Sequence, residues 1–310
     1  MVVLKRVMIL QRIGANNVKG VLFAVLAGLC WGISGCCSQF LFTYKGMVST
    51  WLSPVRLLGS GITMLIVAFF TQRKSLVETA KCKKDMIRIL CYGVFGVMMS
   101  QFSLMTAIQH TNAATATVIQ YVGPVFVMMV VCLRDRRAPR LGEVIAVILA
   151  VGGTYLIATH GDPTYLAVSP EGLIWCLISA LAIVTYTLIP GDVPQRRSGP
   201  VTIGYAMTVG GIVLSLVFGV WNVPPLDFEA ILFILATIFI GAVGGHSFYL
   251  AAIRHIGPIK SSIISSVEPL SSAVISVLWL GNTFMAIDII GFAMILLTVF
   301  LLGGKKKQEE

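Results

Sequence analysis

Apolar residues along this chain run in stretches of about 20, separated by short polar connections. A stretch of about 20 predominantly apolar residues is long enough to cross the hydrocarbon core of a membrane as an α-helix. The pattern therefore predicts an all-α membrane protein with ten transmembrane helices and no room for a soluble domain between them. The expected spans are residues 20–42, 51–71, 87–109, 114–133, 141–159, 170–190, 201–221, 230–252, 261–280 and 287–303.

The composition agrees with a multi-pass membrane protein. Of the 310 residues 57% are hydrophobic and 12% are charged, against about 25% charged in typical soluble domains, and the mean hydropathy is +0.90. The net charge of +10 should set the orientation in the bilayer, so we expect no nucleic-acid partner. The seven cysteines form no CxxC motif and have no histidine at ligand spacing, so we expect no disulfide, no metal and no cofactor.

The positions of the basic residues predict the orientation. Cytoplasmic connections of membrane proteins carry an excess of Lys and Arg. If both termini are cytoplasmic, all 23 Lys and Arg residues except Lys45 and Arg56 lie in inner segments or at an inner helix end. We therefore expect a protein of the cell (cytoplasmic) membrane. Its expected inner segments are residues 1–19, 72–86, 134–140, 191–200, 253–260 and 304–310.

The chain contains an internal repeat. Residues 96–159 align with residues 241–304 at a constant offset of 145 and without a gap, and Pro124 then pairs with Pro269. Each unit would hold five helices, an odd number, so the second copy would enter the membrane in the opposite sense. Inverted repeats are typical of transporters that alternate access to a central site. The two expected repeats are residues 20–159 and 170–304.

Short motifs also follow one another along the chain in a fixed order. They are Pro54 to Leu58, Gln101 with Ala107-Ile108, Asn112 to Phe126, Pro139 through Gly153-Thr154 into Thr159 to Gly161, Tyr186 to Pro190, Gly210-Gly211, and Ile256-Gly257-Pro258 leading to Glu268-Pro269-Leu270. In order and spacing the chain resembles the ten-helix EamA branch of the drug/metabolite transporter (DMT) superfamily over residues 20–304. The resemblance implies a secondary transporter, not an enzyme, and most often implies export of amino acids or related metabolites.

Glu268 is the candidate with the clearest physical argument. It lies in the middle of the ninth span, where a carboxylate is costly unless it is protonated, paired or open to water. One interpretation is a proton-coupling site or a counter-ion for a substrate cation. The alternative is a permanently hydrogen-bonded residue that fixes helix packing. The serines on the same helical stripe are Ser261, Ser265, Ser272 and Ser276.

Pro124 and Pro269 predict two matching helix breaks. A proline has no backbone N–H, so the carbonyls of Gln120 and Ser265 lose their usual helical partner. Breaks near the bilayer midplane line the binding sites of many transporters, although a kink that only improves packing is the alternative. Glu268 has no acidic counterpart in the first repeat, because Gly123 occupies the matching position.

Further polar and aromatic residues inside the spans are candidates for the wall of a substrate cavity. Glutamine and mid-span tryptophan are poorly placed in lipid and should face the interior. For Gln101, Gln120 and Tyr121 the alternative is helix-to-helix hydrogen bonding. For His246 and Tyr249 the alternative is ordinary core packing, which is the favoured interpretation. The predicted cavity residues are Trp31, Gln101, Gln120, Tyr121, Tyr186, Ser265, Glu268, His246 and Tyr249.

Arg56 lies one to two turns inside the outer end of the second span. Its long side chain could reach the outer headgroups by snorkelling. The resemblance implies a gate or a structural role for this arginine, not a substrate contact.

The sequence thus predicts a transporter that moves a small-molecule substrate across the bilayer by alternating access, as a monomer or homodimer, with proton coupling through Glu268 as a hypothesis. A membrane-embedded enzyme acting on lipid would gather ionisable residues near one membrane face, and those of this chain are few and scattered. A structural or sensory membrane protein would carry no substrate flux.

Overall fold

The computed structural model describes residues 2–162, 164 and 166–303, with side chains from residue 17 onward. Within this part of the chain every regular element is a helix. In chain order the elements are α1 (Val2–Tyr44), α2 (Ser49–Thr71), α3 (Arg73–Lys81), α4 (Lys83–Cys91), η1 (Tyr92–Met98), α5 (Met99–His110), α6 (Ala113–Gln120), α7 (Gly123–Arg134), α8 (Leu141–Thr159), α9 (Pro170–Leu188), α10 (Val193–Arg196), α11 (Gly199–Phe218), α12 (Phe228–Ala236), η2 (Thr237–Gly244), α13 (Gly245–Ser265), α14 (Val267–Leu280) and α15 (Ala286–Gly303).

The all-helical membrane fold expected from the apolar stretches is confirmed. Among the described residues, eight helical segments are long and apolar enough to cross a membrane, and Ala286–Leu302 is a shorter apolar helix. The eight segments are Asn17–Tyr44, Ser49–Thr71, Lys83–His110, Ala113–Arg134, Leu141–Thr159, Pro170–Leu188, Gly199–Phe218 and Phe228–Leu280.

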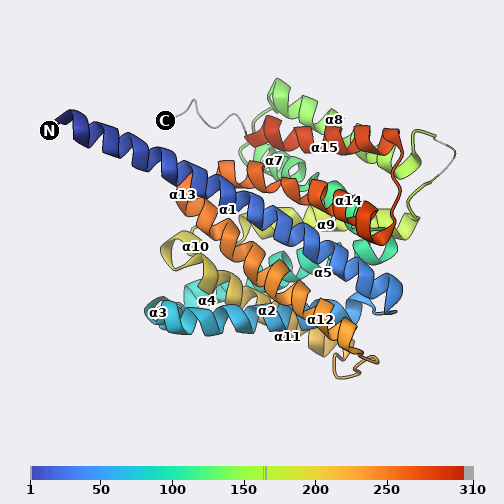
Figure 1. Cartoon of the computed structure of the whole chain (residues 1–310), viewed down its shortest axis with the longest axis horizontal. Coiled ribbons are helices and arrows are strands. Elements are labelled where there is room, and N and C mark those ends of the chain that lie inside the picture. The colour runs from blue at the N-terminus through green and yellow to red at the C-terminus, as the bar shows by residue number, and fades with distance from the viewer. Residues whose placement is uncertain (1, 163, 165, 304–310) are drawn as a thin grey trace.

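The segment Phe228–Leu280 contains two of the expected spans. Its 53 residues would extend about 80 Å as one straight helix, against a hydrocarbon core of about 30 Å. The segment is instead bent back on itself, because Gly257 leaves the helical region with φ 78° and ψ 165°. This conformation favours glycine, and Figure 1 shows that the chain reverses direction within α13, before α14.

The helices pack side by side into one bundle. The strongest helix pairs are α2 with α11, α1 with α13, and α8 with α15, so each pair joins the first half of the chain to the second. The start of α1, α3 and α10 lie toward one end of the bundle, at the left of Figure 1, whereas the connection between α11 and α12 lies at the opposite end.

Three local features differ from the expected spans and connections. The region 72–86, expected as a loop, holds α3 and the start of α4. α1 begins at Val2 and continues through Tyr44, so the backbone shows no boundary after the expected segment 1–19. The third and eighth spans each widen into a π-helix, at η1 and η2. The expected inner segment 304–310 lies outside the described residues.

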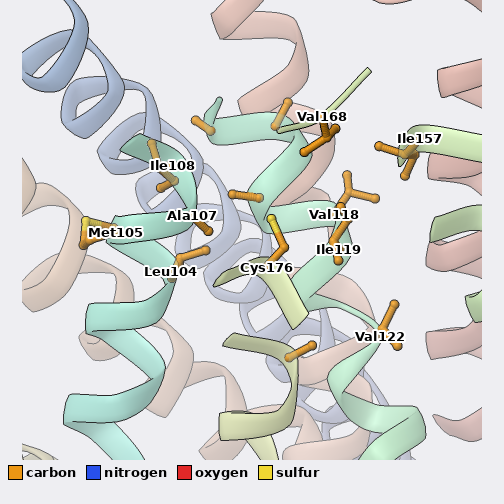
Figure 2. Close-up of a cluster of buried hydrophobic side chains, with 14 of the residues drawn as sticks. Leu104, Met105, Ala107, Ile108, Val118, Ile119, Val122, Ile157, Val168 and Cys176 are labelled. Carbon is orange, nitrogen blue, oxygen red and sulfur yellow. The ribbon is translucent and has the colours of Figure 1, made fainter. Parts of the chain in front are cut away.

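A large apolar core fills the space between α5, α6, α8 and α9. Figure 2 shows Leu104, Met105 and Ile108 extending from α5 near Val118 and Ile119 of α6. These side chains are almost completely buried. Because closely packed side chains have few alternative positions, this core fixes α5 and α6, two helices that also form walls of the cavity described next.

Candidate functional site

A cavity of about 200 Å³ lies in the centre of the bundle. All nine residues that the sequence predicts for a cavity line it, together with Arg56 and Pro124, whereas Pro269 is buried in α14 and does not line it. Eight lining residues were not predicted. They are Gly35, Ser100, Leu104, Met105, Ile108, Thr117, Ile183 and Ser262.

Glu268 is held at this cavity by a tyrosine from the other half of the chain. Its side chain is buried, with a relative exposure of 9%, and the Tyr121 hydroxyl donates to its Oε2 at 3.2 Å. The same hydroxyl oxygen lies 3.3 Å from the backbone carbonyl of Ser265. The Ser265 carbonyl is the one expected to lose its helical partner because of Pro269. Tyr121 therefore contacts both the buried carboxylate of Glu268 and this carbonyl.

Both proline positions coincide with an interruption of the helix. α6 ends at Gln120 and α7 begins at Gly123, while α13 ends at Ser265 and α14 begins at Val267. Pro124 and Pro269 each lie in the first turn of the helix that follows, where a missing N–H loses no intrahelical bond. The regular helical backbone is thus interrupted at two places beside the cavity.

Arg56 points into the bundle, which excludes the suggested snorkelling to the headgroups. It is 6% exposed, and its Nη1 donates to Gln101 Oε1 at 2.9 Å. Its Nε donates to the Thr237 carbonyl at 3.4 Å, at the first residue of η2. A long basic side chain near a helix end can turn either outward or inward, and these two interior acceptors hold Arg56 inward.

One cavity therefore brings together a basic and an acidic residue from different helices. Arg56 comes from α2 and Glu268 from α14, and both side chains line the cavity. A buried charge is tolerated when an opposite charge or hydrogen bonds compensate it. Arg56 has such hydrogen bonds to Gln101 and Thr237, and Glu268 has one from Tyr121.

His246 and three aromatic residues form another wall. The indole of Trp31 lies 5.4 Å from the His246 ring and 5.4 Å from the Tyr249 ring, centroid to centroid. His246 Nδ1 is 2.7 Å from the Ala242 carbonyl. A carbonyl can only accept, so Nδ1 carries the proton of this contact. The Tyr186 ring lies 5.5 Å from the Tyr92 ring, centroid to centroid, in a tilted arrangement.

Gln120 is partly used in packing. Its Nε2 donates to Ser179 Oγ on α9 at 2.6 Å, which agrees with the helix-to-helix hydrogen bonding considered as the alternative for the glutamines. The residue also lines the cavity. Phe248, by contrast, stacks on Phe23 and is not among the lining residues.

Polar contacts join the two halves of the chain at one end of the bundle. Gln39 of α1 accepts from the backbone N–H of Ala113 at 2.9 Å and donates to Asn282 Oδ1 at 3.1 Å. Lys45 pairs with Asp227 and Glu229, each at 2.6 Å. The Lys45 ammonium holds the pKa of Asp227 below its usual range, and Asp227 raises the pKa of Lys45 in turn.

A second ionic cluster joins the halves near α3 and α10. Asp85 accepts from Arg196 at 3.1 Å and from Arg197 at 2.7 Å. Asp192 pairs with Arg196 and with Arg88, and the hydrogen bond from Arg196 lowers the pKa of Asp192. Ion pairs thus connect the two halves at both ends of the bundle, on either side of the central cavity.

A helical membrane bundle around a polar, charge-lined cavity is the architecture of a membrane transporter. The chain belongs to the EamA-like transporter family, which matches residues 18–159 and 170–304. The family match confirms the expected membership of the EamA group of the DMT superfamily. Its two matched segments together cover nearly the whole chain.

Relatives and a solved structure are similar over most of the chain. The uncharacterized inner membrane transporter YicL of Salmonella typhimurium is 33% identical over 286 residues, which cover 92% of this chain and 95% of the relative. The uncharacterized transporter YcbK of Bacillus subtilis is 21% identical and covers 88% of each chain. A structure described as "Crystal structure of protein" matches with a TM-score of 0.61 at 14% identity, covering 91% of this chain and 94% of the other. These relatives are named as transporters, which favours a membrane transporter over an enzyme.

Proposed function

We propose that this protein is a secondary transporter that moves an amino acid or a closely related zwitterion across the cell membrane by alternating access. The observation that carries the proposal is the presence of Arg56 and Glu268 in one small cavity. An amino acid presents a carboxylate and an ammonium group within a few bonds of each other. Arg56 would bind the carboxylate, in place of the gate or structural role that the resemblance implies, and Glu268 would bind the ammonium group. Each contact would be a charge-assisted hydrogen bond.

The remaining predicted cavity residues would complete this site. Gln101 accepts from Arg56 and would orient the guanidinium group toward the substrate. Trp31, Tyr186 and Tyr249 would form an aromatic wall for the substrate side chain. Gln120, Tyr121, Ser265 and His246 would add polar contacts, and the breaks at Pro124 and Pro269 would allow the backbone to open there.

We further propose ten membrane crossings arranged as two inverted five-helix repeats, residues 20–159 and 170–304. The offset of 145 that aligns the repeats also relates Tyr92 to Thr237, where η1 and η2 begin. It relates Gly123, the first residue of α7, to Glu268, the second residue of α14. The reversal at Gly257 supports two crossings within Phe228–Leu280.

Both termini would lie on the cytoplasmic side, together with α3 and α10. Arg73, Lys74, Arg196 and Arg197 belong to these two short helices and their flanks, and basic residues favour the cytoplasmic side. The substrate would move outward, as the family resemblance implies. The active form would be a monomer or a homodimer.

Proton coupling would arise because Glu268 can hold only one partner at a time. A buried carboxylate is costly without a compensating proton or cation. In the empty cavity Glu268 would take a proton while it accepts from Tyr121, and an arriving ammonium group would displace that proton. Export of the substrate would then be linked to entry of a proton.

Purified protein in proteoliposomes tests the proposal. A thermal-shift screen first finds an amino acid that stabilises the protein. That amino acid is then compared with the amine that lacks its carboxylate and with the acid that lacks its amino group. The amino acid should bind at least tenfold more tightly than either analogue, since a hydrogen bond to a charged group contributes about 1.5–3 kcal/mol.

Glu268→Gln should abolish the preference for the amino acid over the acid that lacks the amino group, and should remove the dependence of flux on a pH gradient. Glu171→Gln is the matched control, because Glu171 is an exposed carboxylate that does not line the cavity. Unchanged flux and unchanged gradient dependence in Glu268→Gln would reject the coupling. A protein that no amino acid stabilises would reject the substrate class.

A further inference from the structure

A second hollow lies at the end of α2, separate from the central cavity. Its volume is about 370 Å³, and we call it the basic pocket. Four of its lining residues are cationic and one is acidic. The lining residues are Thr71, Gln72, Arg73, Lys74, Ser75, Glu78, Arg196 and Arg197. The transport proposed for the central cavity does not involve these residues.

The charges of the basic pocket are only partly neutralised. Arg196 pairs with Asp85 and Asp192, while Arg197 pairs with Asp85 and also lies 3.6 Å from Glu78. Within the described part of the chain, no carboxylate forms an ion pair with Arg73 or Lys74. The pocket therefore keeps an excess of positive charge that an anion could compensate.

The walls of the basic pocket are fixed by hydrogen bonds between distant segments. Ser75 Oγ donates to the Arg197 carbonyl at 2.7 Å, and Ser198 Oγ donates to the side chain of Gln72. These bonds tie the start of α3 to the residues that follow α10. The backbone that carries Arg73 and Lys74 is thus held beside Arg196 and Arg197 before any ligand arrives, which reduces the entropic cost of binding.

The basic pocket lies where the membrane-crossing part of α2 ends. The last aromatic residues of α2, Phe69 and Phe70, are exposed, Phe70 to 80%. They face the hydrocarbon region in a membrane. The Arg73 guanidinium lies over the Phe69 ring at 5.1 Å, so a cation of the pocket sits directly at the edge of the lipid-facing surface. Aromatic residues beside basic ones mark the headgroup level of a bilayer.

We propose that the basic pocket binds a phosphate group, supplied by the headgroup of an anionic phospholipid. Basic pockets and clusters of Lys and Arg next to the end of a transmembrane helix attract anionic lipid headgroups. Arg73 and Lys74 compensate the phosphate charge, while Arg196 and Arg197 complete the wall from the second half of the chain. The acyl chains of the same lipid lie along Phe69 and Phe70. Free inorganic phosphate offers the same anion without the apolar part.

The test measures lipid binding by the full-length purified protein, by native mass spectrometry and by thermal unfolding in neutral detergent. Phosphatidylglycerol, phosphatidylcholine and inorganic phosphate are titrated separately at constant ionic strength. Phosphatidylglycerol should bind and stabilise the protein more strongly than phosphatidylcholine. The double variant Arg73→Gln with Lys74→Gln should weaken this binding by roughly tenfold to thirtyfold.

Lys83→Gln with Lys84→Gln is the matched control, because both lysines are exposed on the same short connection and lie outside the basic pocket. The control should change binding by less than about threefold, since only the diffuse surface charge is reduced. The single variant Lys74→Gln, which disturbs no ring contact, should give an intermediate loss and an unchanged melting temperature without lipid.

If phosphatidylglycerol alone binds, and the double variant of Arg73 and Lys74 loses this binding, the result supports the lipid headgroup as the source of the phosphate. Binding of inorganic phosphate with the same dependence on Arg73 and Lys74 supports a phosphate site filled from solution. Equal losses in the pocket and control variants would overturn the proposal, because the attraction would then be general surface charge. Equal binding of the two phospholipids, with no binding of phosphate, would overturn it as well.

Discussion

Tyr121 and Glu268 are 147 positions apart in the chain, and their side chains form a hydrogen bond of 3.2 Å at the central cavity. Tyr121 lies in the interruption between α6 and α7, and Glu268 lies in the first turn of α14. This hydrogen bond therefore links the two interrupted helices of the bundle, besides the contact of the same hydroxyl with the Ser265 carbonyl. Any movement that separates these helices has to break it.

Replacing Tyr121 with Phe should weaken both the fold and transport. The substitution keeps the ring and removes the hydroxyl that contacts Glu268 and the Ser265 carbonyl. Leaving a buried acceptor without its donor costs about 1–3 kcal/mol, so the melting temperature should fall and flux should drop severalfold. Tyr186→Phe is the control, because this tyrosine lines the same cavity without a hydrogen bond to Glu268. Equal effects in both variants would contradict a special role for the Tyr121 bond.

Gly245→Ala should disturb the aromatic wall. A Cβ at Gly245 would overlap the indole of Trp31, so the indole must move toward the cavity or the helices must separate. Overpacking of this kind costs typically about 1–3 kcal/mol. We expect a lower melting temperature and an altered KM for the transported substrate. In Gly152→Ala the new Cβ meets only the terminal methyl of Met294 at 2.8 Å, a flexible group, so stability should change little. A melting temperature for Gly245→Ala equal to that of Gly152→Ala would refute the close contact.

Asp227→Asn should remove an acid-sensitive contribution to stability. The folded-state pKa of Asp227 is lowered, first by the hydrogen bond from Lys45. The contribution is therefore present above the unfolded pKa of about 3.9 and is lost as the pH falls through the lowered folded pKa. Melting temperatures of the parent protein and of Asp227→Asn should differ at neutral pH and converge as the pH falls below about 3.9. Lys45→Gln should show the same convergence, whereas a difference that is constant with pH would exclude this ion pair as its origin.

Cys82 provides a test of the orientation. It lies between α3 and α4, is partly exposed, and should be cytoplasmic with the other residues of this connection. A membrane-impermeant maleimide should label it in inside-out vesicles and should leave intact cells unlabelled. Cys82→Ser should abolish the labelling, which identifies the reactive thiol. Labelling of intact cells would reverse the proposed topology.

The class of fold could be predicted from the sequence because membrane helices follow from local composition. Each long apolar stretch can be recognised in the sequence without knowing which helices pack against it. The two π-helices could not be predicted, because Tyr92–Met98 and Thr237–Gly244 have no residue pattern that separates a π-helix from an α-helix. The short helix α3 was missed for another reason. Its mixture of charged and apolar residues is typical of a loop between two spans. The contacts that hold it, such as the hydrogen bond from Ser75 to Arg197, come from a distant segment of the chain.

The candidate cavity could be predicted only where polar or aromatic residues stand out in an apolar span. Glu268, Gln101 and Trp31 carry that signal. Met105 and Ile183 line the same cavity but resemble any core residue, so no local pattern marks them. The direction of Arg56 depends on the acceptors at Gln101 and Thr237, which belong to other helices. Side-chain direction at such a position is decided by the assembled bundle.

The π-helices η1 and η2 have a consequence for how the chain can change in length. A π-helical turn holds more residues than an α-helical turn, so each segment contains surplus chain relative to an α-helix of equal rise. Deleting one residue there would let the segment close into an α-helix and would leave the orientation of the helix beyond it unchanged. The same deletion at the start of α5 or α13 would rotate everything beyond it by about 100°, so Gln101 would turn away from Arg56, or His246 from Trp31. Single-residue deletions should therefore be tolerated in η1 and η2 and excluded from α5 and α13.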